Sequence, residues 1–171
     1  MRCVNKIVTV TFVTNNGLFR KMTQENPDAA LSDFLPFLLF QAAELSSRNF
    51  QHHYQSRYGM LRTEWRVMFH LGSTGDQTAK HICVRASLHK TKVSRAVKAL
   101  EEKRFLKRNT IQTDRRSEQL CLTHQGKAAF ADLTLIATKF GRELEQSLGT
   151  QDHEKLVAML QKLITLHQPN L

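Results

Sequence analysis

Basic and hydroxyl side chains are concentrated in residues 90–98. The hydrogen-bond donors of this stretch are Lys90, Thr91, Lys92, Ser94, Arg95 and Lys98. Lysine and arginine can neutralise phosphates or bond guanine O6 and N7, and serine and threonine hydroxyls can bond phosphates or contact a thymine methyl group. This combination of residue types predicts contact with nucleic acid; the alternative is a solvated helix surface that happens to be basic.

Apolar residues of the same stretch predict the element that carries these donors. Intervals of three and four residues separate Val93, Ala96, Val97 and Leu100, which is typical of one side of an α-helix. A helix over residues 91–104 would bury this side and present the donors to solvent, most of them near its N-terminal end. Lys98 lies further along the helix, so we expect it to face a phosphate.

A second basic group consists of Asp114, Arg115 and Arg116. It lies in a polar connection, 111–117, between two short stretches of extended character, 105–110 and 118–122, and this pattern predicts a β-hairpin. An arginine at a hairpin tip can enter a narrow minor groove, where the negative potential is enhanced. Asp114 is then expected to orient a neighbouring guanidinium through a charge-assisted hydrogen bond; the alternative is a plain solvated turn.

The excess of positive charge is concentrated in the middle of the chain. The 171 residues carry a net charge of +10, and 13 of the 25 Lys and Arg residues, but only 6 of the 15 Asp and Glu residues, lie between positions 63 and 123. A concentrated excess indicates a phosphate-binding surface rather than a generally solubilising charge. The three widely spaced cysteines argue against a secreted disulfide scaffold and favour the cytoplasm, and no apolar run is long enough for a membrane span.

Residues that could support other chemistry lack the required spacing. His52 and His53 are adjacent, so on a helix they point about 100° apart and cannot chelate one ion by themselves. Cys83 and Cys121 are expected to be small packing residues. We find no acid–base pair, nucleophile–base spacing or phosphate-binding glycine loop, so we expect no enzyme activity, no cofactor and no metal site.

Helical patterns precede the basic stretch. Apolar periodicity predicts a helix from about Leu31 to Tyr58, ended by Gly59. A second helix is expected to begin with Thr63 as its N-cap and to end at Gly72–Gly75, and a short third helix to begin with Thr78 as its cap. Residues 87–89 then form a turn before the basic helix.

Two further helices follow the hairpin. Thr123 is expected to start a helix of roughly 25 residues, and Gly149 separates it from a last helix over 152–166. A helix, a short helix, a turn, an amphipathic helix and a hairpin, in this order, are typical of a winged helix-turn-helix. The predicted fold is therefore mainly α, with six helices and a two-stranded β wing.

Several segments of the sequence resemble the MarR family of bacterial transcription regulators. They are Thr63-Glu64-Trp65-Arg66-Val67-Met68, the stretch VSRAVKALEEK at 93–103, Asp114-Arg115-Arg116, and the stretch LTHQGK at 122–127. The resemblance covers about residues 31–166. It implies a homodimer of winged helix-turn-helix protomers whose terminal helices form the dimer interface. Most members of the family repress transcription, many release DNA on binding a small phenolic or carboxylated ligand, and some respond to oxidation.

The resemblance also implies a division of the chain. Residues 28–60 would form an N-terminal dimerisation helix, 61–123 the DNA-binding domain and 124–171 the C-terminal dimerisation helices. Residues 1–27 are expected to be an N-terminal extension, with the native start at Met22.

The family pattern assigns roles to the basic residues. It places Lys90, Thr91, Lys92 and Arg95 at base edges, Ser94 at a phosphate, Arg116 in the minor groove and Arg115 at the DNA backbone. The sequence departs from the pattern at two positions. Ser87 stands where a glycine commonly makes the turn, and Ile111-Gln112 stands where the wing usually opens with Asp-Pro.

The resemblance also implies a ligand pocket between the dimerisation helices and the DNA-binding domain. Arg48, His52 and Trp65 are its candidate walls, with Arg48 able to bind a carboxylate; alternatively, Arg48 makes an ion pair at the dimer interface. Together with this resemblance, the sequence predicts a homodimeric repressor that binds a pseudo-palindromic operator in double-stranded DNA and is released by a small effector. The alternatives are an oxidation-sensing repressor and a winged-helix module that binds protein without binding DNA.

Overall fold

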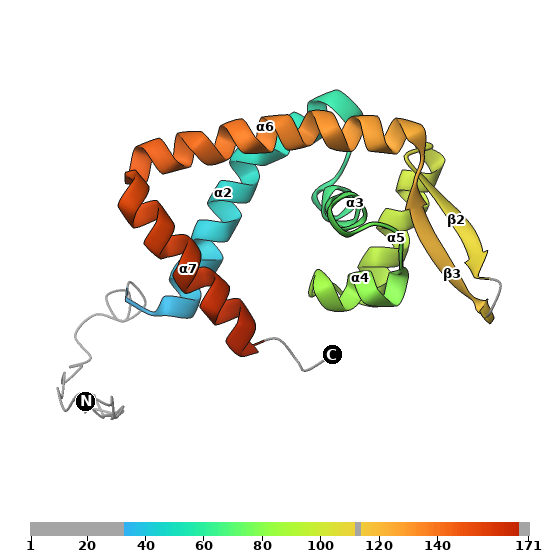
Figure 1. Ribbon diagram of the computed structural model, residues 1–171, viewed down its shortest axis with the longest axis horizontal. Helices are drawn as coiled ribbons and strands as arrows, with labels where there is room; N and C mark the ends of the chain where they lie inside the picture. The colour runs from blue at the N-terminus through green and yellow to red at the C-terminus, as the bar shows by residue number, and fades with distance from the viewer. Residues whose placement is uncertain (1–32, 112–113, 168–171) are drawn as a thin grey trace, which may run out of the picture. The chain divides into compact units, whose positions relative to one another are not determined.

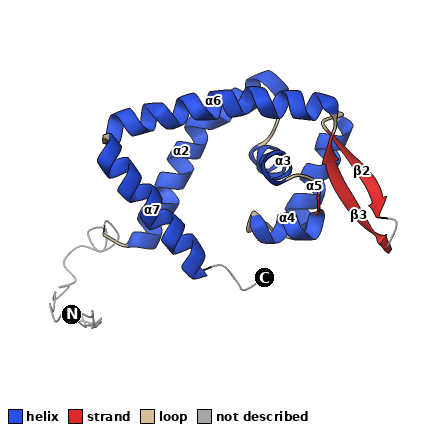
Figure 2. Ribbon diagram, viewed as in Figure 1, coloured by secondary structure: helices blue, strands red, loops and turns tan. Residues whose placement is uncertain are grey.

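A computed structural model describes residues 33–111 and 114–167 of the chain; for residues 111 and 114–117 it describes the backbone alone. The chain divides into two units, Met1–Asn49 and Phe50–Leu171, each of which is described by itself. The described residues form six helices and a small sheet (Figures 1 and 2). In these residues, no helix is both long and apolar enough to cross a membrane.

Helix α2 spans Leu35–Tyr58 and passes from the first unit into the second. Pro36 lies in its first turn, where the missing N–H group is not needed for helical hydrogen bonding. The helix ends at Gly59, as predicted, because this residue adopts a φ of 59° and its N–H group bonds the carbonyl of Gln55 at 2.9 Å. The expected start at about Leu31 is too early: Asp33 and Phe34 are not helical, and the helix begins at Leu35.

The helix-turn-helix consists of α3 (Arg62–Thr74), α4 (Ala79–Arg85) and α5 (Lys90–Glu102). The predicted cap at Thr63 is wrong: the N-cap of α3 is Leu61, two residues earlier, and the Glu64 carboxylate accepts the N–H group of Leu61 at 3.2 Å. Thr78 does cap α4, because its hydroxyl accepts the N–H group of His81. Ser87 adopts a φ of 49° in the turn before α5, so serine takes the left-handed conformation that glycine would adopt more easily.

The wing is the antiparallel hairpin of β2 (Leu106–Ile111) and β3 (Asp114–Leu122), with Leu106 opposite Leu122 and Thr110 opposite Glu118. The predicted two-stranded sheet is incomplete. A third strand, β1 (Gln77–Thr78), pairs with the other side of β3 through Gln77 opposite Leu120, and the strand order is β1-β3-β2. Two residues are too few to show an alternating pattern, so the sequence gives no sign of this strand.

Helices α6 (His124–Leu148) and α7 (Thr150–His167) follow the wing and are separated at Gly149, as predicted. Thr123 caps α6 by accepting the N–H group of Gly126 at 3.0 Å, and its hydroxyl donates to the carbonyl of Arg104 at 2.6 Å. At Gly126, a Cβ atom would lie 2.0 Å from the carbonyl oxygen of Phe105. The first turn of α6 therefore packs directly on the backbone that enters the wing.

The core of the second unit lies among α3, α4, α5, α6 and the sheet. Its fully buried side chains include Met68, Ile82 and Leu133. An aromatic cluster extends this core, with ring centroids of Trp65 5.7 Å from Phe50 and 6.4 Å from Phe130. The four apolar residues predicted for the buried side of α5, namely Val93, Ala96, Val97 and Leu100, are all buried. Figure 1 shows α3, α4 and α5 gathered next to the wing.

Candidate nucleic-acid interface

Helix α5 carries its apolar side chains on one side and its hydrogen-bond donors on the other, as the sequence predicts. The apolar residues face the core, and all six predicted donors are exposed: Lys90, Thr91, Lys92, Ser94, Arg95 and Lys98. Lys98 lies 3.9 Å from Glu102 one turn further on, but both side chains are largely exposed, so this ion pair is weak. The ammonium group of Lys98 can therefore leave Glu102 for a phosphate at little energetic cost.

The N-terminal end of α5 favours anions. Its first turn contains Lys90 and Lys92 and no acidic residue. The helix dipole places partial positive charge at this end. His89 caps the helix, and its Nδ1 atom accepts the N–H group of Thr91 at 3.3 Å. Backbone and side chains thus contribute positive potential at the same place.

The C-terminal end of α5 is tied to the start of α3. Lys103, the C-cap of α5, donates hydrogen bonds to the Glu64 carboxylate and, at 2.8 Å, to the carbonyl oxygen of Gly59. Glu64 is buried, with 4% of its surface exposed. A buried carboxylate requires a charged or hydrogen-bonding partner, so this pair restrains where the end of α5 can lie relative to the start of α3.

A second group of charges ties the wing to α5. The Arg108 guanidinium on β2 bonds Glu118 of β3 at 2.8 Å and Glu101 of α5 at 3.1 Å. The hydrogen bond to Glu118, together with the interactions with Glu101, raises the pKa of Arg108, while burial opposes the rise. Sequence reasoning missed this bridge, although a basic residue seven positions after Glu101 and ten before Glu118 was a possible signal. The bridge joins the two elements that are predicted to contact DNA.

The predicted tip residues of the wing are placed only by their backbone. Asp114, Arg115 and Arg116 begin β3, and Asp114 pairs with Ile111 across the hairpin after an irregularity in register. Their side chains lie outside the described part of the structure. The minor-groove role of Arg116, the backbone contact of Arg115 and the orienting role of Asp114 remain predictions.

The predicted ligand pocket also remains a prediction. Arg48 belongs to the first unit, whereas His52 and Trp65 belong to the second. His52 is exposed, with its ring centroid 6.0 Å from that of His53. Trp65 is half-buried in the aromatic cluster, where its ring stacks on Tyr54. The tryptophan thus contributes to the core of its unit.

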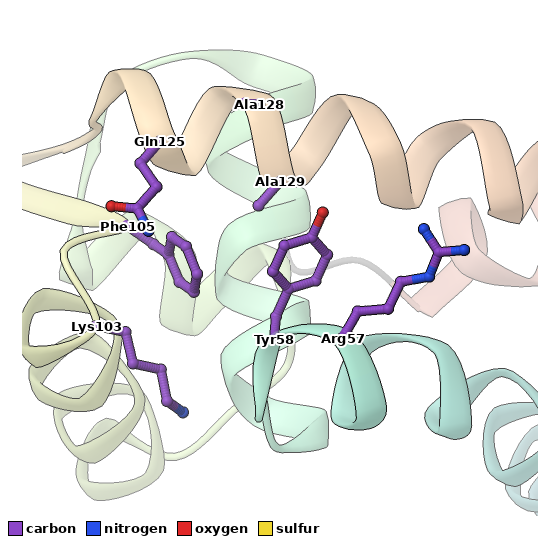
Figure 3. A pocket seen from close by; sticks show the side chains of 7 residues that line it. All are labelled: Arg57, Tyr58, Lys103, Phe105, Gln125, Ala128 and Ala129. Carbon is purple, nitrogen blue, oxygen red and sulfur yellow. The ribbon is translucent and has the colours of Figure 1, made fainter.

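A pocket that the sequence analysis missed lies at the junction of α2, α5 and α6. It has a volume of about 570 Å³ and is lined by Arg57, Tyr58, Lys103, Phe105, Gln125, Ala128 and Ala129 (Figure 3). Arg57 pairs with Asp132 at 2.9 Å, and the Tyr58 hydroxyl donates to the same carboxylate at 2.9 Å. Burial and this hydrogen bond raise the pKa of Tyr58, and the bond from Tyr58, assisted by Arg57, lowers the pKa of Asp132. Both cations of the pocket are already paired with carboxylates.

The two cysteines that the structure describes, Cys83 and Cys121, pack against other residues of the protein. Cys121 is buried in β3, and burial, followed by contact with Asp76, raises the pKa of its thiol to about 11. Cys83 is half-buried against the core. A thiol with a raised pKa contains little of the nucleophilic thiolate at neutral pH, which disfavours oxidation at Cys121. Among the described residues, no three His, Cys, Asp or Glu side chains are grouped to hold a metal ion.

Comparison with known proteins agrees with this arrangement. Residues 58–117, which include the helix-turn-helix and most of the wing, match the sequence model of the MarR family. An uncharacterised HTH-type transcriptional regulator of Bacillus subtilis, YwoH, is 26% identical over 97 residues, which cover 57% of this chain and 70% of that protein.

Solved structures of the family share the fold. A MarR/EmrR family regulator from Acinetobacter sp. ADP1 is similar with a TM-score of 0.65 and 27% identity, covering 82% of this chain and 96% of the other. Bordetella bronchiseptica BpsR, whose DNA binding is regulated by 6-hydroxynicotinic acid, has a TM-score of 0.69 and 18% identity over 77% of this chain and 98% of its own, which shows the fold alone. In the matched segment and in its winged helix-turn-helix fold, the chain is similar to transcriptional regulators of the MarR family.

Proposed function

We propose that the chain is a homodimeric repressor that binds a pseudo-palindromic operator. The observation that carries this proposal is the arrangement of side chains on α5: all of its predicted donors are exposed, and all of its predicted apolar residues are buried. Helix α5 enters the major groove with its N-terminal end toward the bases, and the wing reaches the adjacent minor groove. A twofold dimer then requires half-sites about 10 bp apart, or a small multiple of this spacing.

Each predicted donor has a role in this complex. The side chains of Lys90, Thr91, Lys92 and Arg95 contact base edges, while Ser94 and Lys98 contact phosphates. Arg116 enters the minor groove, Arg115 contacts the backbone, and Asp114 orients a guanidinium before DNA arrives. These roles follow from the family pattern and from the chemistry of each side chain.

Exposed apolar surface supports dimerisation through the terminal helices. In the described chain, α7 has no buried residue, and it exposes Leu156, Val157, Met159, Ile164 and Leu166. Large apolar side chains left exposed along a whole helix support its use as an interface. We assign residues 28–60 and 124–171 to dimerisation, 61–123 to DNA binding and 1–27 to an extension, and we place the protein in the bacterial cytoplasm.

A small effector is expected to relieve repression. Arg48, His52 and Trp65 remain the proposed walls of its site, with Arg48 as the carboxylate-binding residue. The ligand-regulated DNA binding of BpsR supports this part of the proposal, because the two chains share a fold. The raised pKa of Cys121 argues against the alternative of a sensor that is oxidised at this thiol.

A gel-shift assay with duplex DNA from directly upstream of the chain's own gene tests DNA binding. We expect a shift that persists in the presence of an excess of non-cognate duplex, and a dimeric mass by light scattering at micromolar concentration. Failure to shift either this duplex or any duplex selected from a random library at low salt would favour the protein-binding alternative. A monomeric mass would contradict the dimer.

A further inference from the structure

The cap of α5 determines the protonation pattern of His89. Its Nδ1 atom accepts the N–H group of Thr91 at 3.3 Å, so this nitrogen carries a lone pair and no proton. In neutral imidazole, the proton must then be on Nε2, which becomes a hydrogen-bond donor. The hydrogen bond that caps the helix therefore also fixes the tautomer of the neutral His89 ring.

The position of the cap directs this donor away from the helix. The two ring nitrogens face different directions, so Nε2–H points away from the N–H group that Nδ1 accepts. His89 is exposed, and within the described chain no hydrogen bond or ion pair involves Nε2. The donor is thus available next to the N-terminal end of the helix that carries Lys90 and Lys92.

We propose that His89 is a further DNA-contacting residue, whose Nε2–H group donates a hydrogen bond to a backbone phosphate oxygen. This inference rests on the proposed entry of α5 into the major groove. A phosphate is the expected acceptor, because His89 precedes the helix, and the helix dipole and the first-turn lysines favour an anion at the same place. The contact restrains the register of α5 on DNA without distinguishing among bases.

Substitution by asparagine and aspartate separates the cap from the contact. Both side chains have nearly the same shape, and both offer an oxygen to the N–H group of Thr91. Only asparagine also supplies a donor, whereas aspartate places negative charge next to a phosphate. His89→Ala removes both the cap and the donor.

Binding is measured on an operator duplex that the unmodified protein selects from a random-sequence library, and on a non-cognate duplex of equal length. We expect His89→Asn to bind within about threefold of the unmodified protein, and His89→Asp to bind at least about tenfold more weakly, on both duplexes. His89→Ala should lose about tenfold in affinity and also melt at a lower temperature, while the other two variants keep the melting temperature.

An Asn and Asp pair at Ser73, an exposed residue in the last turn of α3, controls for the added charge. These two variants should bind DNA equally within about twofold, because the added charge is a small part of the total field. Equal affinities of His89→Asn and His89→Asp, or an equal loss in both, would overturn the contact and leave His89 as a cap. If the unmodified protein selected no duplex, the proposed function would fail instead, so the two failures are distinguishable.

Discussion

The buried carboxylate of Glu64 joins the start of α3 to the end of α5 by accepting a hydrogen bond from the ammonium group of Lys103. The two residues are 39 positions apart in the sequence. Glu64 also accepts the N–H group of Leu61, and Lys103 also bonds the carbonyl of Gly59, so both charges have second partners. The pair therefore connects the loop after α2 with the helix that is proposed to contact DNA.

Replacing Lys103 should destabilise the fold more than replacing Glu64. Lys103→Met leaves a buried carboxylate without its cation, so we expect a loss of about 3 kcal/mol in the free energy of unfolding. Glu64→Gln removes the buried charge itself and keeps the shape, so a smaller loss of about 1–2 kcal/mol is expected. Urea unfolding at one protein concentration measures both values.

The exposed pair of Lys139 and Glu143 provides the control. Its ammonium and carboxylate lie 4.0 Å apart on α6 with both side chains largely exposed. Lys139→Met should change the free energy of unfolding by less than about 0.5 kcal/mol. An effect of Lys103→Met no larger than this would show that the buried pair adds nothing to stability.

Base preference and overall affinity should respond to different residues of α5. Arg95→Ala is expected to cost about 1–3 kcal/mol and to relax preference at one base pair per half-site, because it removes a donor to a base edge. Lys98→Ala should weaken binding nearly equally for all sequences and reduce the salt dependence by about one phosphate contact. Titrations over a set of single-base operator variants at several salt concentrations distinguish the two. Altered base preference in Lys98→Ala with none in Arg95→Ala would mean that the proposed register of α5 is wrong.

The wing should contribute where the minor groove is narrow. Arg116→Ala is expected to weaken binding most for operators with A·T-rich flanks, since a narrow groove attracts a guanidinium most strongly. Affinities for operators that differ only in their flanks, A·T-rich or G·C-rich, measure this. Arg116→Lys keeps the charge and serves as the matched variant. Equal losses on both flanks would indicate an ordinary phosphate contact in place of minor-groove insertion.

The buried thiol of Cys121 should be unreactive at neutral pH. Its pKa of about 11 leaves almost no thiolate at pH 7.5, so iodoacetamide should modify Cys83 before Cys121, as mass spectrometry of peptides can show. The folded chain holds this proton more tightly than the unfolded chain, whose thiol has a pKa near 9.0. The protonated Cys121 thiol therefore makes its full contribution to the free energy of unfolding below about pH 9, and this contribution is lost as the pH rises toward 11. Rapid modification of Cys121 in the folded protein at pH 7.5 would contradict this account.

Several features of this fold could be predicted because their causes are local. The buried residues of helix α5 recur at intervals of three to four residues, and these intervals can be recognised in the sequence. Gly59, Thr123 and Gly149 act within one turn of the helices that they end or begin, so residue type and position suffice to identify them. The prediction at Thr63 failed because Thr63 and Glu64 both suit a helix start, and the carboxylate forms the bond to Leu61.

Other features depend on residues that meet only in the folded chain. Strand β1 exists because β3 offers an unpaired edge to Gln77, and Arg108 bridges Glu101 and Glu118 because the hairpin folds back next to α5. Likewise, the pocket at Arg57 and Phe105 forms where α2, α5 and α6 come together. Local periodicity thus identifies the helices and the exposed side of α5. Long-range packing decides which charges pair, because a buried charge needs a partner close to it in space, and that partner can lie anywhere in the chain.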